Sequence, residues 1–301
     1  MSIEDLSDTK NLKTTWGSPL FKNHISTIDS IVSQRIKEAG AIIIGKTNTP
    51  EFGLGSHTYN SVNGITRNPY DLSKTAGGSS GGTAAALAAN LLPVADGSDM
   101  MGSLRNPAAF NNVYGFRPTW GLVPNDADGD NFMQTLATSG PMARNPMDLA
   151  RLLETMVGPN PLVPVNLTPS DCYTSGLDKP VSNKRIGWID DWNGYYQYEH
   201  GINELCKDAL TKYSKMGVEV EKFIPEFDPN LLWHSWLTLR SWSVSNGRRD
   251  LYRDKSKRDL LKPEIIYEIE SGLALSATQV YEASVVRSNW FQYLTKVFTK
   301  Y

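Results

Sequence analysis

Two short stretches of the chain combine serine with glycine. "TAGGSSGG", residues 75–82, places Ser79 and Ser80 among four glycines. Glycine loses the most conformational freedom on ordering, so such a cluster indicates that the backbone must approach something closely. The alanine-rich run "TAAALAAN" follows at once, and a glycine-rich loop leading into a helix is typical of a backbone anion or oxyanion site. A flexible linker is the alternative, although the stretch is short for one.

A second serine lies downstream in "DGSDMMGSLR". Ser103 follows a predicted strand and a tight turn, and Asp99 and Arg105 bracket it as a potential ion pair. A lone serine at such a place is usually a helix N-cap. Two serine-bearing glycine loops joined by one helix indicate instead that both loops lie at one edge of a sheet. A serine hydroxyl placed there can act as a nucleophile if a base takes its proton.

The segments around these loops alternate between helix and strand. Apolar residues on one face predict a helix from Ser26 or Thr27 to Gly40, with Ile28 among its buried residues. "AIIIG", 41–45, predicts a buried strand, and "PVADGS" predicts a second one. "PMDLARLLETMV" predicts an amphipathic helix over 146–157. This order predicts an α/β fold.

The second half of the chain begins after a segment rich in Pro, Asn and Ser, residues 158–182. Beyond it, "KRIGWIDD" and "VEVEKF" are typical of strands that flank a helix over 200–215. Three more helices are expected, over 230–245, 263–275 and 277–300, the last with Ser276 as its N-cap.

Composition excludes several classes of protein. The 301 residues are 40% hydrophobic and 21% charged, as in soluble globular proteins. The net charge of −2 gives no basic footprint for nucleic acid, and no apolar run is long enough to cross a membrane. Two cysteines indicate a reducing cytoplasm, and four scattered histidines predict no metal site. We expect no cofactor.

The longest motif is "GGSSGGTAAALAANLLPVADGSDMMGSLRNPAAFNNVYGFRPTWG", and it resembles the signature of the amidase signature family. "GAIIIGKTNTPEFG" and "TTWGSP" upstream resemble the same family. The resemblance is strong over residues 3–158 and weaker to 301. It implies a hydrolase of carbon–nitrogen bonds acting on a small amide, with a fold described as α/β, a mixed twisted sheet covered by helices.

The resemblance also implies the catalytic residues. Ser103 corresponds to the nucleophile, and Ser79 corresponds to the bridging serine, preceded by a cis peptide bond at Gly78. The N–H groups of Met100, Met101, Gly102 and Ser103 correspond to the oxyanion hole, although Met101 stands where the family more often has glycine. We expect the hydroxyls of Ser79 and Ser103 to lie within or near hydrogen-bonding reach.

The base departs from the family pattern. The family places a lysine ahead of the "TTWGSP"-like stretch, and Glu4 occupies the matching position. Lys10, Lys13 and Lys46 do not match it. We expect Glu4 to lie near Ser79, and we expect activity to be impaired or absent.

The resemblance covers the middle of an amidase. We therefore expect one partial amidase domain over 1–301, with a signature-bearing core (1–158), a loop-rich boundary (159–182) and the remainder (183–301). Missing strands would leave sheet edges uncovered, which predicts association between copies. Two other functions stay open. The chain could be a non-catalytic amidase-like binding protein or gene remnant, or, least favoured, it could bind a nucleotide through its glycine loop, which lacks a P-loop ending.

Overall fold

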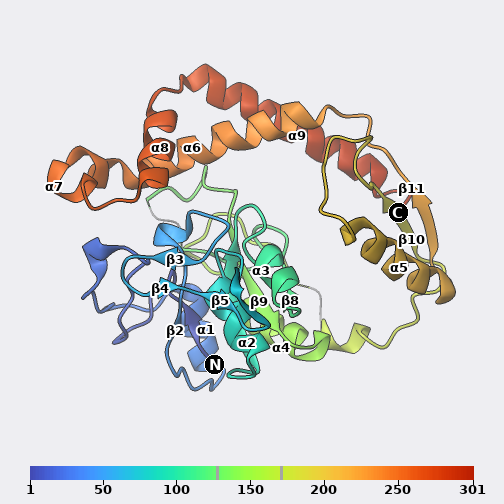
Figure 1. The fold of residues 1–301 in the computed structure, drawn as a ribbon, viewed down its shortest axis with the longest axis horizontal. Helices are drawn as coiled ribbons and strands as arrows, with labels where there is room; N and C mark the ends of the chain where they lie inside the picture. Colours follow the sequence, from blue (N-terminus) through green and yellow to red (C-terminus); the bar gives the residue numbers. More distant parts are fainter. Residues whose placement is uncertain (127–128, 170–171) are drawn as a thin grey trace. The chain divides into compact units, whose positions relative to one another are not determined.

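The computed structural model describes residues 1–126, 129–169 and 172–301. These residues divide into two compact units. The first unit comprises 1–177 and 247–267, and the second comprises 178–246 and 268–301. Figure 1 follows the chain through both.

The first unit is built on a mixed sheet. β1 (Ile3–Glu4) pairs in parallel with β2 (Lys46–Thr47), and a Ser2–Ala95 bridge joins β1 to β7 (Val94–Asp99). β7 then pairs antiparallel with β9 (Thr138–Ala143), which pairs antiparallel with β8 (Tyr114–Gly115). Strands of both directions therefore occur in one sheet, as the expected mixed α/β fold requires.

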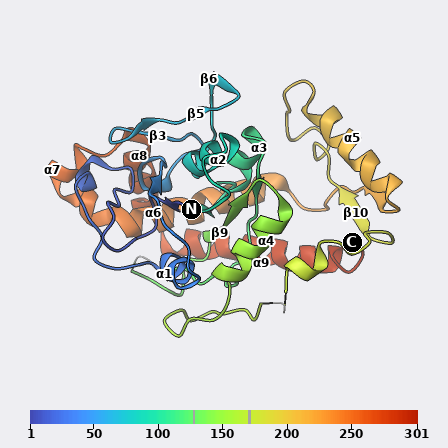
Figure 2. The ribbon, with the colours of Figure 1, turned by 90° about the horizontal axis from the view of Figure 1, so that it is seen from below.

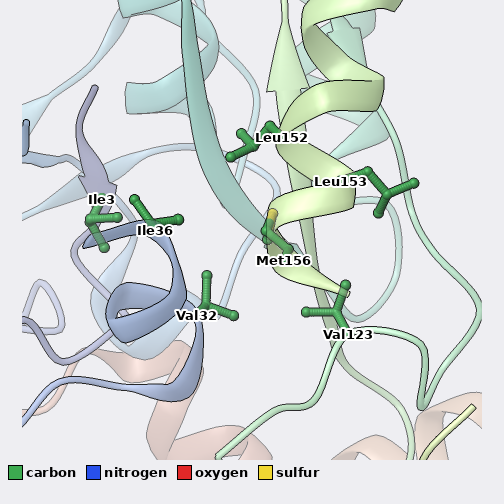
Figure 3. Packing of buried hydrophobic residues seen from close by; sticks show 7 residues of the cluster. All are labelled: Ile3, Val32, Ile36, Val123, Leu152, Leu153 and Met156. Carbon is green, nitrogen blue, oxygen red and sulfur yellow. The ribbon is translucent and has the colours of Figure 1, made fainter. Parts of the chain in front are cut away.

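Helices cover both faces of this sheet. α1 (Ile31–Glu38) and α4 (Pro146–Met156) bury a cluster against β1, and Figure 3 shows its residues: Ile3, Val32, Ile36, Val123, Leu152, Leu153 and Met156. α2 (Gly81–Ala88) and α3 (Arg105–Phe110) bury a second cluster, which comprises Ala84, Leu87, Leu92, Ala95, Leu104, Ala108 and Met142. Val94 packs against the first cluster and Ala95 belongs to the second. Because successive strand residues point to opposite faces, the two clusters lie on opposite sides of the sheet (Figure 2).

Smaller elements complete the first unit. Two hairpins pair β3 (Tyr59–Asn60) with β4 (Gly64–Ile65) and β5 (Arg67–Asn68) with β6 (Asp71–Thr75). Short 3-10 turns span Pro19–Phe21, Glu51–Gly53 and Thr174–Gly176. α7 (Lys255–Arg258) belongs to this unit as well.

The second unit pairs β10 (Arg185–Trp188) in parallel with β11 (Glu219–Lys222) across α5 (Ile202–Lys215). Long helices follow along the chain: α6 (Pro229–Arg253), α8 (Pro263–Leu273) and α9 (Ala277–Val297). Residues 247–253 of α6 and 263–267 of α8 are counted in the first unit, and the rest of these helices in the second. Ser276 caps α9 in a capping box with Gln279, which confirms the predicted N-cap. The predicted strand, helix and strand order of this segment is also confirmed.

Two predictions near the N-terminus are wrong. The expected strand over 41–45 is instead a two-residue strand at Lys46–Thr47, and the side chains of Ile42 and Ile44 are 79% and 68% exposed. The segment does run beside β1, since Ile3 N–H donates to the Gly45 carbonyl at 3.1 Å. However, other elements cover only one side of this segment. An apolar run in the sequence does not reveal whether one side or both sides will be covered.

The first helix also begins later than predicted. Ser30 caps α1 by accepting a hydrogen bond from the Ser33 N–H, so the helix begins at Ile31. Ile28 therefore lies outside the helix and is 61% exposed.

Candidate active site

The glycine-rich loop connects β6 to α2. Its Gly78–Ser79 peptide bond is cis, as predicted. Gly77 has a φ of +73°, which is a left-handed conformation that favours glycine. A Cβ on Gly82 would overlap the backbone of Asn48. The cluster of glycines therefore serves close packing of this loop, and the linker interpretation is wrong.

The second loop follows β7 and leads into α3. Ser80 N–H donates to the Ser103 carbonyl at 3.2 Å, so the two serine-bearing loops adjoin. The backbone thus places Ser79 and Ser103 on neighbouring loops. Within the described ranges, no hydrogen bond joins their hydroxyls, and the closer hydroxyl contact stays a prediction.

Asp99 organises the loop that carries Ser103. Its buried carboxylate accepts hydrogen bonds from Gly102 N–H at 2.7 Å and Leu104 N–H at 3.1 Å, the residues on either side of Ser103. The predicted ion pair with Arg105 is present at 3.0 Å. Arg117 adds a second ion pair at 2.9 Å, which sequence reasoning missed because nothing in "YGFRPTWG" indicates where that side chain reaches.

The charge state of Asp99 follows from these contacts. Burial alone would raise its pKa, but hydrogen bonds from Arg105 and Gly102, the charge of Arg105 and a hydrogen bond from Arg117 lower the pKa to about 2. Asp99 is therefore ionised at neutral pH and fixes the turn.

One of the four expected oxyanion donors is already occupied. The Gly102 N–H donates to the Asp99 carboxylate. The N–H groups of Met101 and Ser103, in contrast, donate to no acceptor in the described part of the chain. These two N–H groups remain candidates for binding a developing oxyanion. Met100 makes other contacts.

Glu4 lies in the sheet core, 1% exposed, on β1. Its carboxylate accepts hydrogen bonds from the hydroxyls of Ser80 at 2.6 Å and Ser98 at 2.7 Å. The described hydrogen bonds of this carboxylate therefore come from Ser80, the residue after Ser79, and from Ser98, which sequence reasoning missed. Burial and then the charge of Asp96 raise the pKa of Glu4 to about 8.

Two further charged groups lie behind Glu4. Asp96 accepts a hydrogen bond from the Glu4 N–H at 2.8 Å, and burial raises its pKa to about 6. The Lys46 ammonium donates to the Ser7 carbonyl and, at 3.0 Å, to the Thr9 hydroxyl. Lys46 thus ties down the N-terminal loop, and among the described residues it makes no hydrogen bond to any of the site serines.

The chain resembles known proteins over most of its length. It is 38% identical over 222 residues to one subunit of the glutamyl-tRNA(Gln) amidotransferase of Thermus thermophilus, covering 74% of this chain and 46% of that protein. The corresponding protein of Legionella pneumophila is 39% identical over 235 residues, with 77% and 48% covered. The chain thus spans about half the length of these curated relatives.

Solved structures agree with this. A bacterial aryl acylamidase of the amidase signature family matches with a TM-score of 0.92 and 26% identity, over 99% of this chain and 63% of that one. The corresponding glutamyl-tRNA(Gln) amidotransferase protein of Thermotoga maritima matches with a TM-score of 0.82 and 28% identity, over 100% and 65%. The expected fold, a mixed sheet covered by helices, is confirmed. The family model described as Amidase matches residues 1–283, and the chain belongs to the amidase family.

Proposed function

We propose that this protein is an amide hydrolase of the serine type whose turnover is impaired by Glu4. In the proposed reaction the Ser103 oxygen bonds to the amide carbonyl carbon and its proton passes toward Ser79. The carbon–nitrogen bond then breaks as the nitrogen takes up a proton, and water releases the acyl group from Ser103. The adjoining loops and the Met101 and Ser103 N–H groups support these roles.

The protonation state of Glu4 is the observation that supports impaired turnover. A base must be deprotonated before it can accept the serine proton. With a pKa raised to about 8, Glu4 keeps its own proton over most of the neutral range and cannot take up the serine proton. When ionised, it places a negative charge in a buried site where an oxyanion must form, and burial leaves that repulsion unscreened.

The experiment is a comparison of Glu4→Lys with the parent protein on a panel of small aliphatic and aryl amides. A lysine can be neutral before it takes the proton and cationic afterwards, so we expect hydrolysis to rise by about 100-fold or more. Ser103→Ala in both backgrounds should abolish turnover. Glu38→Lys, on the exposed end of α1, is the matched charge control and should change nothing.

Fast turnover by the parent, lost in Ser103→Ala, would contradict the impairment while leaving the nucleophile in place. Equal inactivity of parent and Glu4→Lys, both folded, would favour the second function, a non-catalytic amidase-like binding protein or gene remnant. A buried acid held by two serine hydroxyls is the observation that favours this alternative.

The nucleotide-binding alternative has little support. A phosphate loop needs free N–H groups. Here Ser80 N–H donates to Ser103, Gly81 N–H donates to the Thr58 hydroxyl, and Gly82 N–H donates to the Asn48 carbonyl.

The partner and the compartment belong to this proposal as well. We propose a small amide as substrate and a cytoplasmic location, which fits two cysteines that are both unpaired. No helix in the described ranges is long and apolar enough to cross a membrane. Association between copies stays a prediction.

A further inference from the structure

Thr58 lies directly before β3 and is buried against the loop that carries Ser79, with 1% of its surface exposed. Its hydroxyl shares one proton between two carbonyls of that loop, Gly77 at 2.9 Å and Ser79 at 3.1 Å. The same oxygen accepts a hydrogen bond from the Gly81 N–H at 3.1 Å. Because a hydroxyl both donates and accepts, this one group holds the backbone on both sides of Ser79.

The Thr58 hydroxyl is itself held in place. The Thr58 N–H donates to the Gly77 carbonyl at 3.0 Å, and the Thr58 carbonyl accepts from the Thr66 N–H at 2.9 Å, beyond the β3–β4 hairpin. A Cβ built on Gly81 would overlap the hydroxyl, so glycine lets the start of α2 approach it this closely. Threonine is also stiff at χ1, because two heavy atoms branch from its Cβ. The loop is therefore anchored to a side chain with little freedom of its own.

The Ser79 hydroxyl depends on this anchored backbone for its position. Ser79 is 2% exposed, and its hydroxyl makes no hydrogen bond to another residue in the described ranges. The neighbouring Ser80 hydroxyl, in contrast, is bound to Glu4 at 2.6 Å. The backbone that Thr58 holds therefore sets where the Ser79 hydroxyl lies. A misplacement of about 1 Å can lower the rate of a reaction about 100-fold.

We propose that Thr58 is a positioning residue, whose hydroxyl keeps the Ser79 hydroxyl where it can accept the proton of Ser103. The inference rests on the proposed function, because it needs Ser103 as the nucleophile and Ser79 as the proton relay. Thr58 touches no reacting atom in this role and acts only through Ser79. Loss of its hydroxyl should therefore lower the rate constant of the covalent step and leave the binding of a reagent unchanged.

An alkyl fluorophosphonate tests this without requiring turnover. The Ser103 oxygen bonds to phosphorus, fluoride leaves with the bonding electron pair, and the serine proton leaves through the Ser79 hydroxyl to water. Intact-mass spectrometry follows labelling over time at several probe concentrations, which separates the maximal rate from half-saturation. Ser79→Ala is measured first, in the parent and in the Glu4→Lys protein. The background in which it slows labelling more is then used for Thr58.

Three variants isolate the hydroxyl of Thr58. Thr58→Val keeps the branched shape and should lower the maximal labelling rate about 10- to 100-fold at unchanged half-saturation. Thr58→Ala should do the same, and it serves if the extra methyl of valine prevents folding. Thr58→Ser restores the hydroxyl and should label within about threefold of the background, whereas a role in packing alone would not be rescued by this smaller side chain.

A double variant distinguishes action through Ser79 from general damage to the loops. When Thr58→Val is combined with Ser79→Ala, labelling should be no slower than with Ser79→Ala alone, because the two changes remove one function. Thr155→Val is the matched control, since it removes a hydroxyl that bonds to the Arg151 carbonyl on α4, and it should label like its background. Urea unfolding midpoints establish that each variant is folded.

The results that would overturn the inference differ from those that would overturn the proposed function. If folded Thr58→Val and Thr58→Ala label within threefold of a background that Ser79→Ala slows, Thr58 has no positioning role and the proposed reaction stands. If Thr58→Val slows labelling just as much when Ser79 is absent, Thr58 does not act through Ser79. If neither folded background is labelled at Ser103, the proposed nucleophile fails and the role of Thr58 fails with it.

Discussion

Replacing Glu4 by glutamine should change how the stability of this protein depends on pH. Glu4 is 1% exposed, and burial together with the charge of Asp96 raises its pKa from an ordinary 4.5 to about 8. An acid with a folded-state pKa above its unfolded value favours folding most when it is protonated. Its contribution is therefore complete below pH 4.5 and is lost as the pH rises toward 8.

The magnitude follows from these two values. Each pH unit between them removes about 1.4 kcal/mol from the free energy of unfolding. The parent should lose about 3 kcal/mol from this group by pH 7 and about 5 kcal/mol by pH 9. Glutamine copies the shape of the protonated acid and never ionises. One of the Ser80 and Ser98 hydroxyls can rotate to accept from the amide NH2 while the other donates to the amide oxygen, so Glu4→Gln should escape this loss.

The assay is urea unfolding at pH 5, 6, 7, 8 and 9, followed by fluorescence of the eight tryptophans. The difference in unfolding free energy between Glu4→Gln and the parent should grow steadily from pH 5 to pH 8 and then level off. Glu38→Gln, on an exposed glutamate, is the matched control and should parallel the parent. Parallel curves for Glu4→Gln and the parent over the whole range would refute the argument.

Three more substitutions test the packing, two in the site and one on α6. Asp99→Asn should lower the free energy of unfolding by about 2 kcal/mol at pH 7, because Asp99 has a pKa of about 2 in the folded protein and is ionised there. The difference from the parent should shrink as the pH falls toward 2. Chemical unfolding at about pH 2.5 and about pH 7 measures it. Gly82→Ala should destabilise by more than about 2 kcal/mol despite the better helix propensity of alanine, since its Cβ would overlap the Asn48 backbone. Gly247→Ala, in open space on α6, should instead stabilise by up to about 1 kcal/mol. Thermal unfolding of both glycine variants and the parent measures these two changes.

Local patterns predicted much of what positions the site. The capping serine of α9, the strand that leads to Asp99 and the helix after the glycine loop each follow from neighbouring residues in the sequence. The Asp99–Arg105 ion pair spans six residues and one turn, so its spacing was informative. The family resemblance placed the cis bond at Gly78–Ser79. The strand over 41–45 failed because composition does not determine which side of a strand other elements cover.

The partners of Glu4 could not be predicted in this way. They depend on the pairing of β1 with β7, where Ser2 lies opposite Ala95 in a parallel bridge. That register brings the carboxylate of Glu4 to the hydroxyl of Ser98, 94 residues away in sequence. A shift of one residue would turn Glu4 to the other face of the sheet, against the apolar cluster that holds Ile3. The register of two strands so far apart is set by the packing of both faces together, and it decides whether this acid meets the serine loop at all.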